Sequence, residues 1–142
     1  MASKTKSSKI GVHPPPHPML ADITELETRD THGNFANFFK SGDIIILHVH
    51  LIYPEEIADV QGEYNLNIYC REIAPNLQSF AAYSKSITDK LIPNTTDFNL
   101  DIDFTAVSPG AQPGVYMYLA TFDFGPASDF GAWLYSNAFF VF

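Results

Sequence analysis

The stretch FNLDIDFTA, residues 98–106, alternates apolar and polar side chains along its whole length. Its apolar side holds Phe98, Leu100, Ile102, Phe104 and Ala106, and its polar side holds Asn99, Asp101, Asp103 and Thr105. A period of two places each set on its own face of a half-buried antiparallel strand, whereas a helix would mix the two sets. Other stretches of the chain repeat this pattern, so the sequence predicts an all-β fold.

Four further stretches read as strands, at residues 44–53, 63–72, 115–124 and 133–142. Both faces of 44–53 are largely apolar, which predicts a central strand covered on both sides, at least in part. In 63–72 the inward positions are expected to be Tyr64, Leu66, Ile68 and Cys70. Together with 98–106, these stretches predict several strands that bury one face against a common core.

Two other segments, residues 19–29 and 77–91, fit both a helix and a strand. We favour strands for both, because the surrounding chain reads as sheet. As a strand, the first segment would place on one face Leu20, Asp22, Thr24 and Leu26. Residues 31–41 contain Gly, Asn and Asp turn signals and are predicted to form a loop.

Gly- and Pro-rich turns separate about seven candidate strands, a pattern typical of two packed antiparallel sheets. The segment Gly114-Val115-Tyr116 enters one of the apolar strands near the C-terminal end. It resembles the tyrosine corner of immunoglobulin-like sandwiches, in which the phenol oxygen bonds to the backbone of the preceding loop. The resemblance implies an immunoglobulin-like antiparallel β-sandwich, and it implies no particular function.

The N-terminal part differs in composition from the rest of the chain. Residues 1–12 are rich in Ser and Lys, and three consecutive prolines follow in HPPPHP at 13–18. Consecutive prolines favour an extended conformation. We therefore predict a flexible basic and Pro-rich arm at 1–18 and one β-sandwich domain at 19–142.

The formal net charge is −8, and it is unevenly distributed. Lys4, Lys6 and Lys9 precede residue 20, whereas all 16 acidic residues follow it. An acidic body repels phosphate backbones, so we expect no nucleic-acid partner. Cys70 is the only cysteine, so an intramolecular disulfide cannot form, which fits a reducing compartment. The N-terminal residues show no apolar region typical of a secretory signal, and no apolar run is long enough for a membrane helix. We therefore predict a cytoplasmic protein without a membrane span.

His48 and His50 are the candidate metal ligands, because residues two apart on a strand point to the same face. Two imidazoles can reach one ion, but a zinc site needs three or four protein ligands. The sequence does not bring any further histidine to this pair. The alternative is that both are polar residues at the surface of a sheet.

Tyr69, Tyr83, Trp133 and Tyr135 are candidate binding residues, because exposed aromatic side chains can stack on sugar rings or anchor a protein partner. The alternative is that they cover the second face of a sheet. No convergent set of catalytic groups is visible, so we predict no catalytic residue and no cofactor. Cys70 alternates inward with Leu66 and Ile68 and reads as a core residue.

These observations favour a non-catalytic protein-interaction or assembly module that pairs with a protein partner or with itself as a homo-oligomer. An exposed apolar patch could come from Ile44, Ile46 and Ile52, or from Phe139 and Val141. The alternative function is a module that binds carbohydrate or another small ligand through the outward aromatic residues with Asn65, Asn67 or the aspartates. A small enzyme is the third possibility, and nucleic-acid binding ranks below it.

Overall fold

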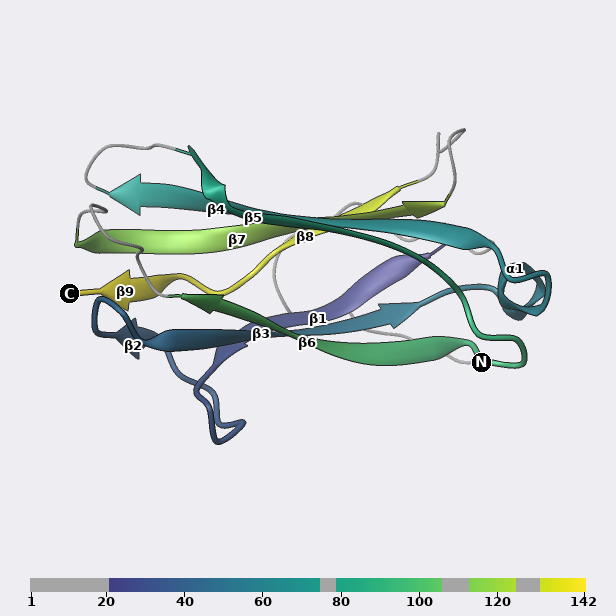
Figure 1. The fold of residues 1–142 in the computed structure, drawn as a ribbon, viewed down its shortest axis with the longest axis horizontal. Helices are drawn as coiled ribbons and strands as arrows, with labels where there is room; N and C mark the ends of the chain where they lie inside the picture. Colours follow the sequence, from purple (N-terminus) through teal and green to yellow (C-terminus); the bar gives the residue numbers. More distant parts are fainter. Residues whose placement is uncertain (1–20, 75–78, 106–112, 125–130) are drawn as a thin grey trace.

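The structure is a computed structural model, and it describes residues 21–74, 79–105, 113–124 and 131–142. The predicted arm at 1–18 lies outside the described residues, as do Leu20 and Ala106. Within the described ranges the chain is almost entirely β-structure (Figure 1). None of the described helices is long and apolar enough to cross a membrane.

The described residues form nine strands and one short helix. In chain order these are β1 (Asp22–Arg29), β2 (Phe38–Phe39), β3 (Ile44–Ile52), α1 (Glu55–Asp59), β4 (Glu63–Ala74), β5 (Ser79–Lys90), β6 (Asp97–Thr105), β7 (Gly114–Phe124), β8 (Ala132–Tyr135) and β9 (Phe139–Val141). Both ambiguous segments contain strands, β1 and β5, as predicted.

The strands form two sheets that pack face to face, with β4, β5, β7 and β8 in the upper layer of Figure 1 and β1, β3 and β6 in the lower one. The smaller sheet has the order β1-β3-β6, and both of its pairings are antiparallel. The larger sheet has the order β2-β9-β7-β4-β5, and β8 pairs with β7. The prediction of an immunoglobulin-like β-sandwich is therefore confirmed.

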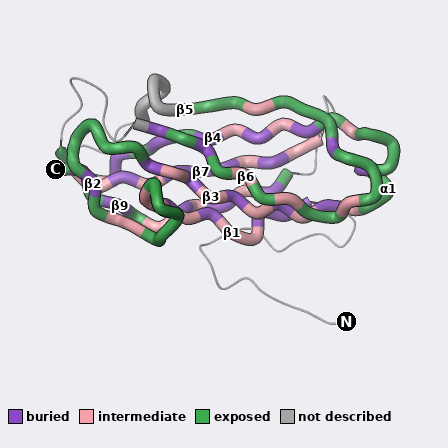
Figure 2. The backbone as a smooth tube through the Cα atoms, turned by 60° about the horizontal axis from the view of Figure 1, so that its bottom comes forward, coloured by how far each residue is buried: buried purple, intermediate pink, exposed green. Residues whose placement is uncertain are grey.

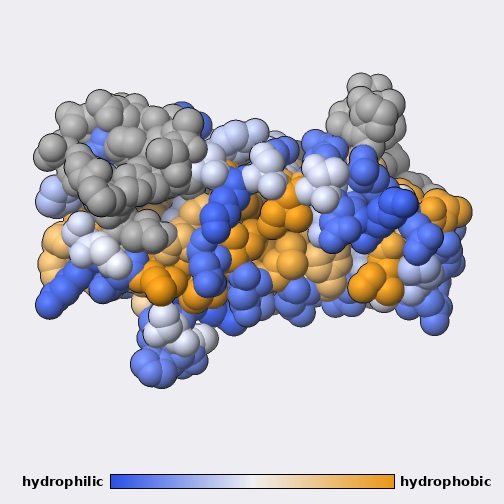
Figure 3. All heavy atoms as spheres, in the orientation of Figure 1, coloured by the Kyte–Doolittle hydropathy of each residue, from blue (hydrophilic) through white to orange (hydrophobic). Residues whose placement is uncertain are grey.

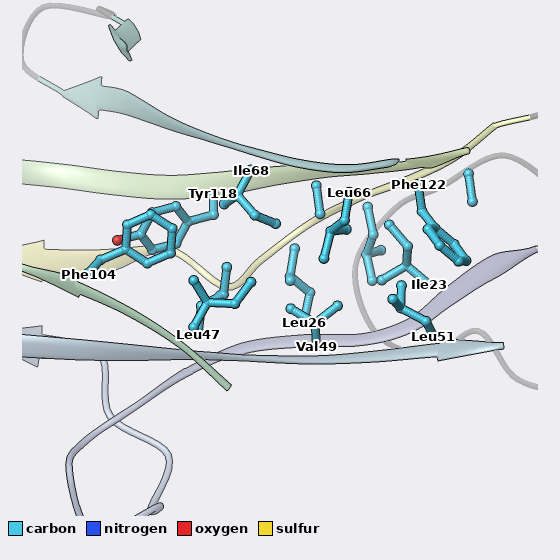
Figure 4. Close-up of a cluster of buried hydrophobic side chains, with 14 of the residues drawn as sticks. Ile23, Leu26, Leu47, Val49, Leu51, Leu66, Ile68, Phe104, Tyr118 and Phe122 are labelled. Atoms are coloured by element: carbon cyan, nitrogen blue, oxygen red, sulfur yellow. The ribbon is translucent and has the colours of Figure 1, made fainter. Parts of the chain in front are cut away.

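Alternation along the strands builds the core. On β3 the side chains of Ile45, Leu47, Val49 and Leu51 are at most 1% exposed, whereas the residues between them are half-buried. Figure 2 shows this alternation as repeated changes between buried and partly buried residues along the strands. In Figure 4, Leu66, Ile68 and Phe122 of the larger sheet point toward Leu47 and Leu51 of the smaller one. The predicted inward set of β4, Cys70 included, is likewise buried.

A lysine connects the two sheets at one edge of the sandwich. Lys85 of β5 donates a hydrogen bond to the backbone oxygen of Asp103 on β6, and its ammonium lies 4.9 Å from the centroid of the Phe104 ring. Figure 3 shows hydrophobic side chains in the middle of this edge with hydrophilic ones around them. The long lysine side chain thus covers apolar surface while its charge stays near water.

The predicted facing of β1 is wrong at its first residues. Its pairing with β3 shifts between Ile23 and Glu25, a β-bulge that puts one extra residue into β1. Because side chains alternate with a period of two, the bulge changes which residues point inward. Ile23, Leu26 and Thr28 are therefore fully buried, whereas Thr24 is only half-buried.

The predicted last strand is two strands, and the break has a side-chain cause. Ser136 donates its N–H to Tyr118 O at 2.8 Å, and its hydroxyl accepts a hydrogen bond from Tyr118 N at 2.9 Å. One residue thus occupies both backbone positions of β7 between β8 and β9. Asn137 then turns its side chain to β1, where it accepts from Thr28 N at 3.0 Å and donates to Thr28 Oγ1 at 2.8 Å.

Two short elements were not predicted. The supposed loop at 31–41 contains β2, which pairs in parallel with β9 through Phe38 and Phe39. The strand end at Pro54 continues directly into α1. Both are too short to show a period in the sequence, and β2 is fixed by its partner β9 rather than by its own two residues.

Candidate functional site

The structure brings three of the four predicted aromatic residues to one face. Tyr69 of β4 and Trp133 and Tyr135 of β8 all lie on the side of the larger sheet that faces away from the core. Tyr69 is 43% exposed, and the other two are half-buried. Their sequence neighbours Ile68 and Leu134 point inward and are fully buried. Tyr83 belongs to β5, and its side chain lies outside what the structure describes.

The register of β4, β7 and β8 arranges these residues in rows across the sheet. Tyr69 is paired with Leu119, and Leu119 with Tyr135, in one row. The next row runs from Asn67 through Thr121 to Trp133. The rings of Trp133 and Tyr135 meet edge to face, with centroids 5.9 Å apart. We call these six residues the aromatic face.

Polar side chains border the aromatic face on the β5 side. The amide oxygen of Asn67 accepts a hydrogen bond from Ser86 at 2.7 Å, and that of Asn65 accepts one from Thr88 at 2.9 Å. Asn65 also donates to Asp123 at 3.0 Å. The border is therefore a ladder of amide and hydroxyl groups, ending at the carboxylate of Asp123, beside the apolar and aromatic groups.

At the other end of the aromatic face, Arg71 is paired with Met117. Arg71 is exposed and Met117 is half-buried. Sequence reasoning missed Met117 and Leu119 as surface residues. The signal was available, because residues 115–120 are apolar at both alternating sets of positions, and a strand can turn only one set to the core.

The two predicted metal ligands lie on the outer face of the smaller sheet. His48 has a carboxylate at each ring nitrogen, with Asp101 2.7 Å from Nδ1 and Glu25 3.1 Å from Nε2. His50 has Asp97 2.8 Å from Nε2 and the hydroxyl of Thr24 at Nδ1. The two histidines therefore connect β3 to both of its neighbours.

This arrangement orients each imidazole through strand pairing. A neutral imidazole carries one N–H, so it donates to one carboxylate, and only a charged ring can donate to two. Within the ranges that the structure covers, no group of three or more His, Cys, Asp or Glu is arranged to hold a metal ion. A metal at His48 and His50 stays a prediction.

A second apolar region lies at the β2 edge of the larger sheet. Phe38 and Phe140 are 63% and 40% exposed, and their rings stack with centroids 4.9 Å apart. The predicted patch of Phe139 and Val141 is wrong, because both are buried in the core. The prediction assumed one unbroken strand, in which Phe139 and Val141 share a face with Trp133 and Tyr135. The break after β8 instead turns Phe139 and Val141 inward. Of the other predicted patch, Ile44 is exposed, and Ile46 and Ile52 are half-buried beside the histidines.

Besides Tyr64, two ionisable groups, Cys70 and Glu72, are buried on the inner face of β4. Burial raises the pKa of the Cys70 thiol to about 12, so the thiol is protonated at neutral pH and is a poor nucleophile. The carboxyl group of Glu72 is also buried, and neither of its oxygens has a hydrogen-bond partner in the described part of the chain. Such burial costs the fold stability.

Known proteins share the fold of this chain but not its sequence. No protein family matches the chain, and no curated protein matches it. A β-glucosidase from Listeria innocua aligns with 82% of this chain at a TM-score of 0.50 and 12% identity. Spo0M, a sporulation control protein from Bacillus subtilis, aligns with 86% at the same TM-score and identity.

The aligned part is a fraction of each of those proteins. The chain covers 16% of the length of the β-glucosidase and 49% of the length of Spo0M. At such low sequence identity, a similar fold does not carry an activity with it. The chain is thus similar in fold to one part of a β-glucosidase and to one part of a sporulation control protein. The similarity establishes the fold alone.

Proposed function

We propose that this chain is a non-catalytic protein-interaction module and that the aromatic face is its contact surface. The observation that carries the proposal is the grouping of Tyr69, Tyr135 and Trp133 around Leu119 on the outside of the larger sheet. Tyr, Trp and Arg are the residues that most often dominate binding energy at protein interfaces. An apolar centre with a polar rim is the usual anatomy of such a contact.

The outer side of the larger sheet around the aromatic face is large enough for a contact. Three strands, β7, β4 and β5, span about 14 Å across the sheet, and the outward positions from Glu63 to Arg71 span about 27 Å along β4, to which the four residues of β8 add a short fourth strand. The resulting footprint of about 450 Å² per partner lies at the lower end of specific interfaces. We also propose that the protein works in the cytoplasm, which its single, buried cysteine supports.

Site-specific photocrosslinking in the native cells tests this function. Benzoylphenylalanine in place of Tyr69 should give covalent adducts with a partner protein. The same photoreactive residue in place of Val60, which is 78% exposed on the connection after α1, should give none. Adducts at both positions or at neither would overturn the proposal. An adduct of any protein specific to Tyr69 supports it, whether that protein is a different one or a second copy.

Carbohydrate binding is the second candidate, and the polar ladder favours it. Sugars present both hydroxyl groups and an apolar ring face, which suit amide groups placed beside aromatic rings. Here Asn67 lies in the same row as Trp133. This function predicts that an oligosaccharide quenches the fluorescence of Trp133, and that Asn67→Ala weakens the quenching at unchanged melting temperature. Unchanged fluorescence across a glycan panel would remove this candidate.

A further inference from the structure

We propose that the partner at the aromatic face is a second copy of this chain, packed face to face about a two-fold axis that crosses the strands. This inference rests on the proposed function and names the partner of the same surface. A two-fold axis makes one patch serve both copies, so the patch must complement itself in shape and in charge. The following observations on the described residues meet both conditions.

Charge distinguishes the outer faces of the two sheets. On the larger sheet, the outward charged residues of β4, β5 and β7 are two acids and two bases, namely Glu63, Asp123, Arg71 and Lys90. On the smaller sheet, the outward acids that are exposed or half-buried are Glu25, Glu27, Asp97, Asp101 and Asp103, with Arg29 as the basic residue. Two chains of net charge −8 therefore approach each other best through the larger sheet, with their acidic faces turned away.

The order of the rows makes the aromatic face self-complementary. Along β4 and β7 the rows run from Arg71 and Met117, through the Tyr69 and Asn67 rows, to Asn65 and Asp123. An axis that crosses the strands at the level of Ile68 reverses this order in the second copy. The Tyr69 row of one copy then lies over the Asn67 row of the other, and Tyr135 of one copy faces Trp133 of the other.

The same operation places opposite charges together. Arg71 of one copy comes to the level of Asn65 and Asp123 of the other, and it does so twice because of the symmetry. Asp123 is one strand away, about 4.8 Å, from the position directly opposite Arg71, which a long arginine side chain can reach across sheets about 10 Å apart. An axis along the strands would instead set Arg71 of one copy at the level of Arg71 of the other, and the repulsion between the two positive charges disfavours this arrangement. Sheets that pack this way are aligned to within about 30°.

A charge-reversal experiment tests this geometry. Arg71→Glu and Asp123→Arg should each weaken dimerisation at least about tenfold, because each replaces two attractive pairs by two repulsive ones. An equimolar mixture of the two variants should form a heterodimer, since both of its pairs are again attractive. The measurements are the solution mass by light scattering over a range of concentrations and the melting temperature of each variant.

The matched controls are Lys40→Glu and Asp103→Arg, which make the same charge changes at exposed positions outside the surface of β8, β7, β4 and β5 that the dimer would bury, and they should leave the dimer intact. If Asp123→Arg fails to fold, Asn65→Lys replaces it, because it sets a positive charge directly opposite Arg71. A wild-type chain that stays monomeric, or a dimer that neither reversal weakens, would overturn the inference. So would reversals that weaken the dimer but do not pair with each other.

The two levels of the proposal can fail separately. A monomeric chain whose Tyr69 position still crosslinks to a different protein removes the second copy as partner and leaves the interaction module in place. A chain that gives no crosslink at Tyr69 and no dimer removes both.

Discussion

Single residues in this sandwich differ in how far their role follows from their neighbours. Cys70 was expected in the core from the alternation of β4, and it is 5% exposed. Gly62 lies between α1 and β4, and its N–H donates to Ile57 O at 2.9 Å. The sequence around Gly62 does not show that the backbone of Ile57 lies too close to leave space for a side chain at this position.

Cys70 should be unreactive in the native protein. Thiol reagents attack the thiolate, and burial holds the pKa at about 12 against an ordinary value of 9.0. Titration with a chromogenic disulfide at neutral pH should show no free thiol until denaturant is added. The unfolded chain loses this proton at lower pH than the folded one, so the contribution of Cys70 to stability is full below pH 9 and falls as pH rises toward 12. Fast labelling of the native chain would contradict the buried position.

Gly62→Ala should lower the free energy of unfolding by about 1–3 kcal/mol, a cost typical of overpacking. A Cβ at this position would lie 2.6 Å from Ile57 Cγ2 and 3.0 Å from Ile57 O, and the backbone oxygen cannot move freely. Urea unfolding gives the value. Gly131→Ala is the control, because its nearest contact of 3.6 Å is ordinary. Equal free energies of unfolding for the two variants would show that α1 can move away from the added methyl group without loss of stability.

Among the elements, the broken last strand holds the two sheets together. Its two halves, β8 and β9, both pair with β7, and the turn between them sends the Asn137 side chain to β1 of the other sheet. Thr28, the residue that it meets, is fully buried. The hydrogen-bonded side chain of Asn137 at this strand break therefore links the two sheets, whereas an unbroken strand would pair only within its own sheet.

Asn137→Ala should destabilise the protein by about 2–3 kcal/mol, because it leaves the buried N–H of Thr28 without its partner. The midpoint of urea unfolding and the hydrogen exchange of the Thr28 amide should both report the loss. Asn99→Ala removes an amide from an exposed position on β6 and should change stability by less than about 0.5 kcal/mol. Similar effects of the two substitutions would contradict a special role for Asn137.

Deletion of residues 134–142 should prevent folding. The deleted segment contains three buried apolar side chains, Leu134, Phe139 and Val141, and its removal exposes the edge of the central β7. Circular dichroism and heat denaturation test this expectation. The exchange Phe142→Ala, at a position that is 61% exposed, should keep the fold. A truncated chain that stays soluble and melts cooperatively would refute the prediction.

As a whole molecule the sandwich is one core shared by two sheets, so the sheets should unfold together. Leu47 of the smaller sheet is fully buried, and Trp133, the only tryptophan, lies on the larger sheet. Leu47→Ala should lower the free energy of unfolding by about 2–5 kcal/mol. Because folding of a small domain is cooperative, Trp133 fluorescence should report the full change.

The control for this change is Val60→Ala, at a position that is 78% exposed, which should leave the midpoint of unfolding within experimental error. An unchanged Trp133 midpoint in Leu47→Ala, together with earlier melting of the smaller sheet, would instead show that the sheets unfold independently.

The sequence by itself determined the fold class and most of the core. Alternation in 63–72 and 98–106 predicted the inward side of each strand, because a strand offers only two faces and water selects between them. In 98–106, Ile102 and Phe104 are buried, whereas Phe98 and Leu100 are half-buried. In 44–53 both faces are apolar, and only the structure showed which of them faces the core. Inward Leu66 and Ile68 follow from this rule without knowledge of any partner strand. The same local rule placed Tyr69, Trp133 and Tyr135 on outer faces.

Only the tertiary structure decided what lies beside what. The rows of the aromatic face depend on the pairings of β4 with β7 and of β7 with β8, and strand order is a long-range property that local patterns do not contain. The bulge in β1, the parallel pair of β2 with β9 and the contacts of His48 with two carboxylates likewise arise where distant segments meet. Alternation selects the face of each residue, and pairing selects its neighbours, so the candidate site became visible only once the strands were assembled.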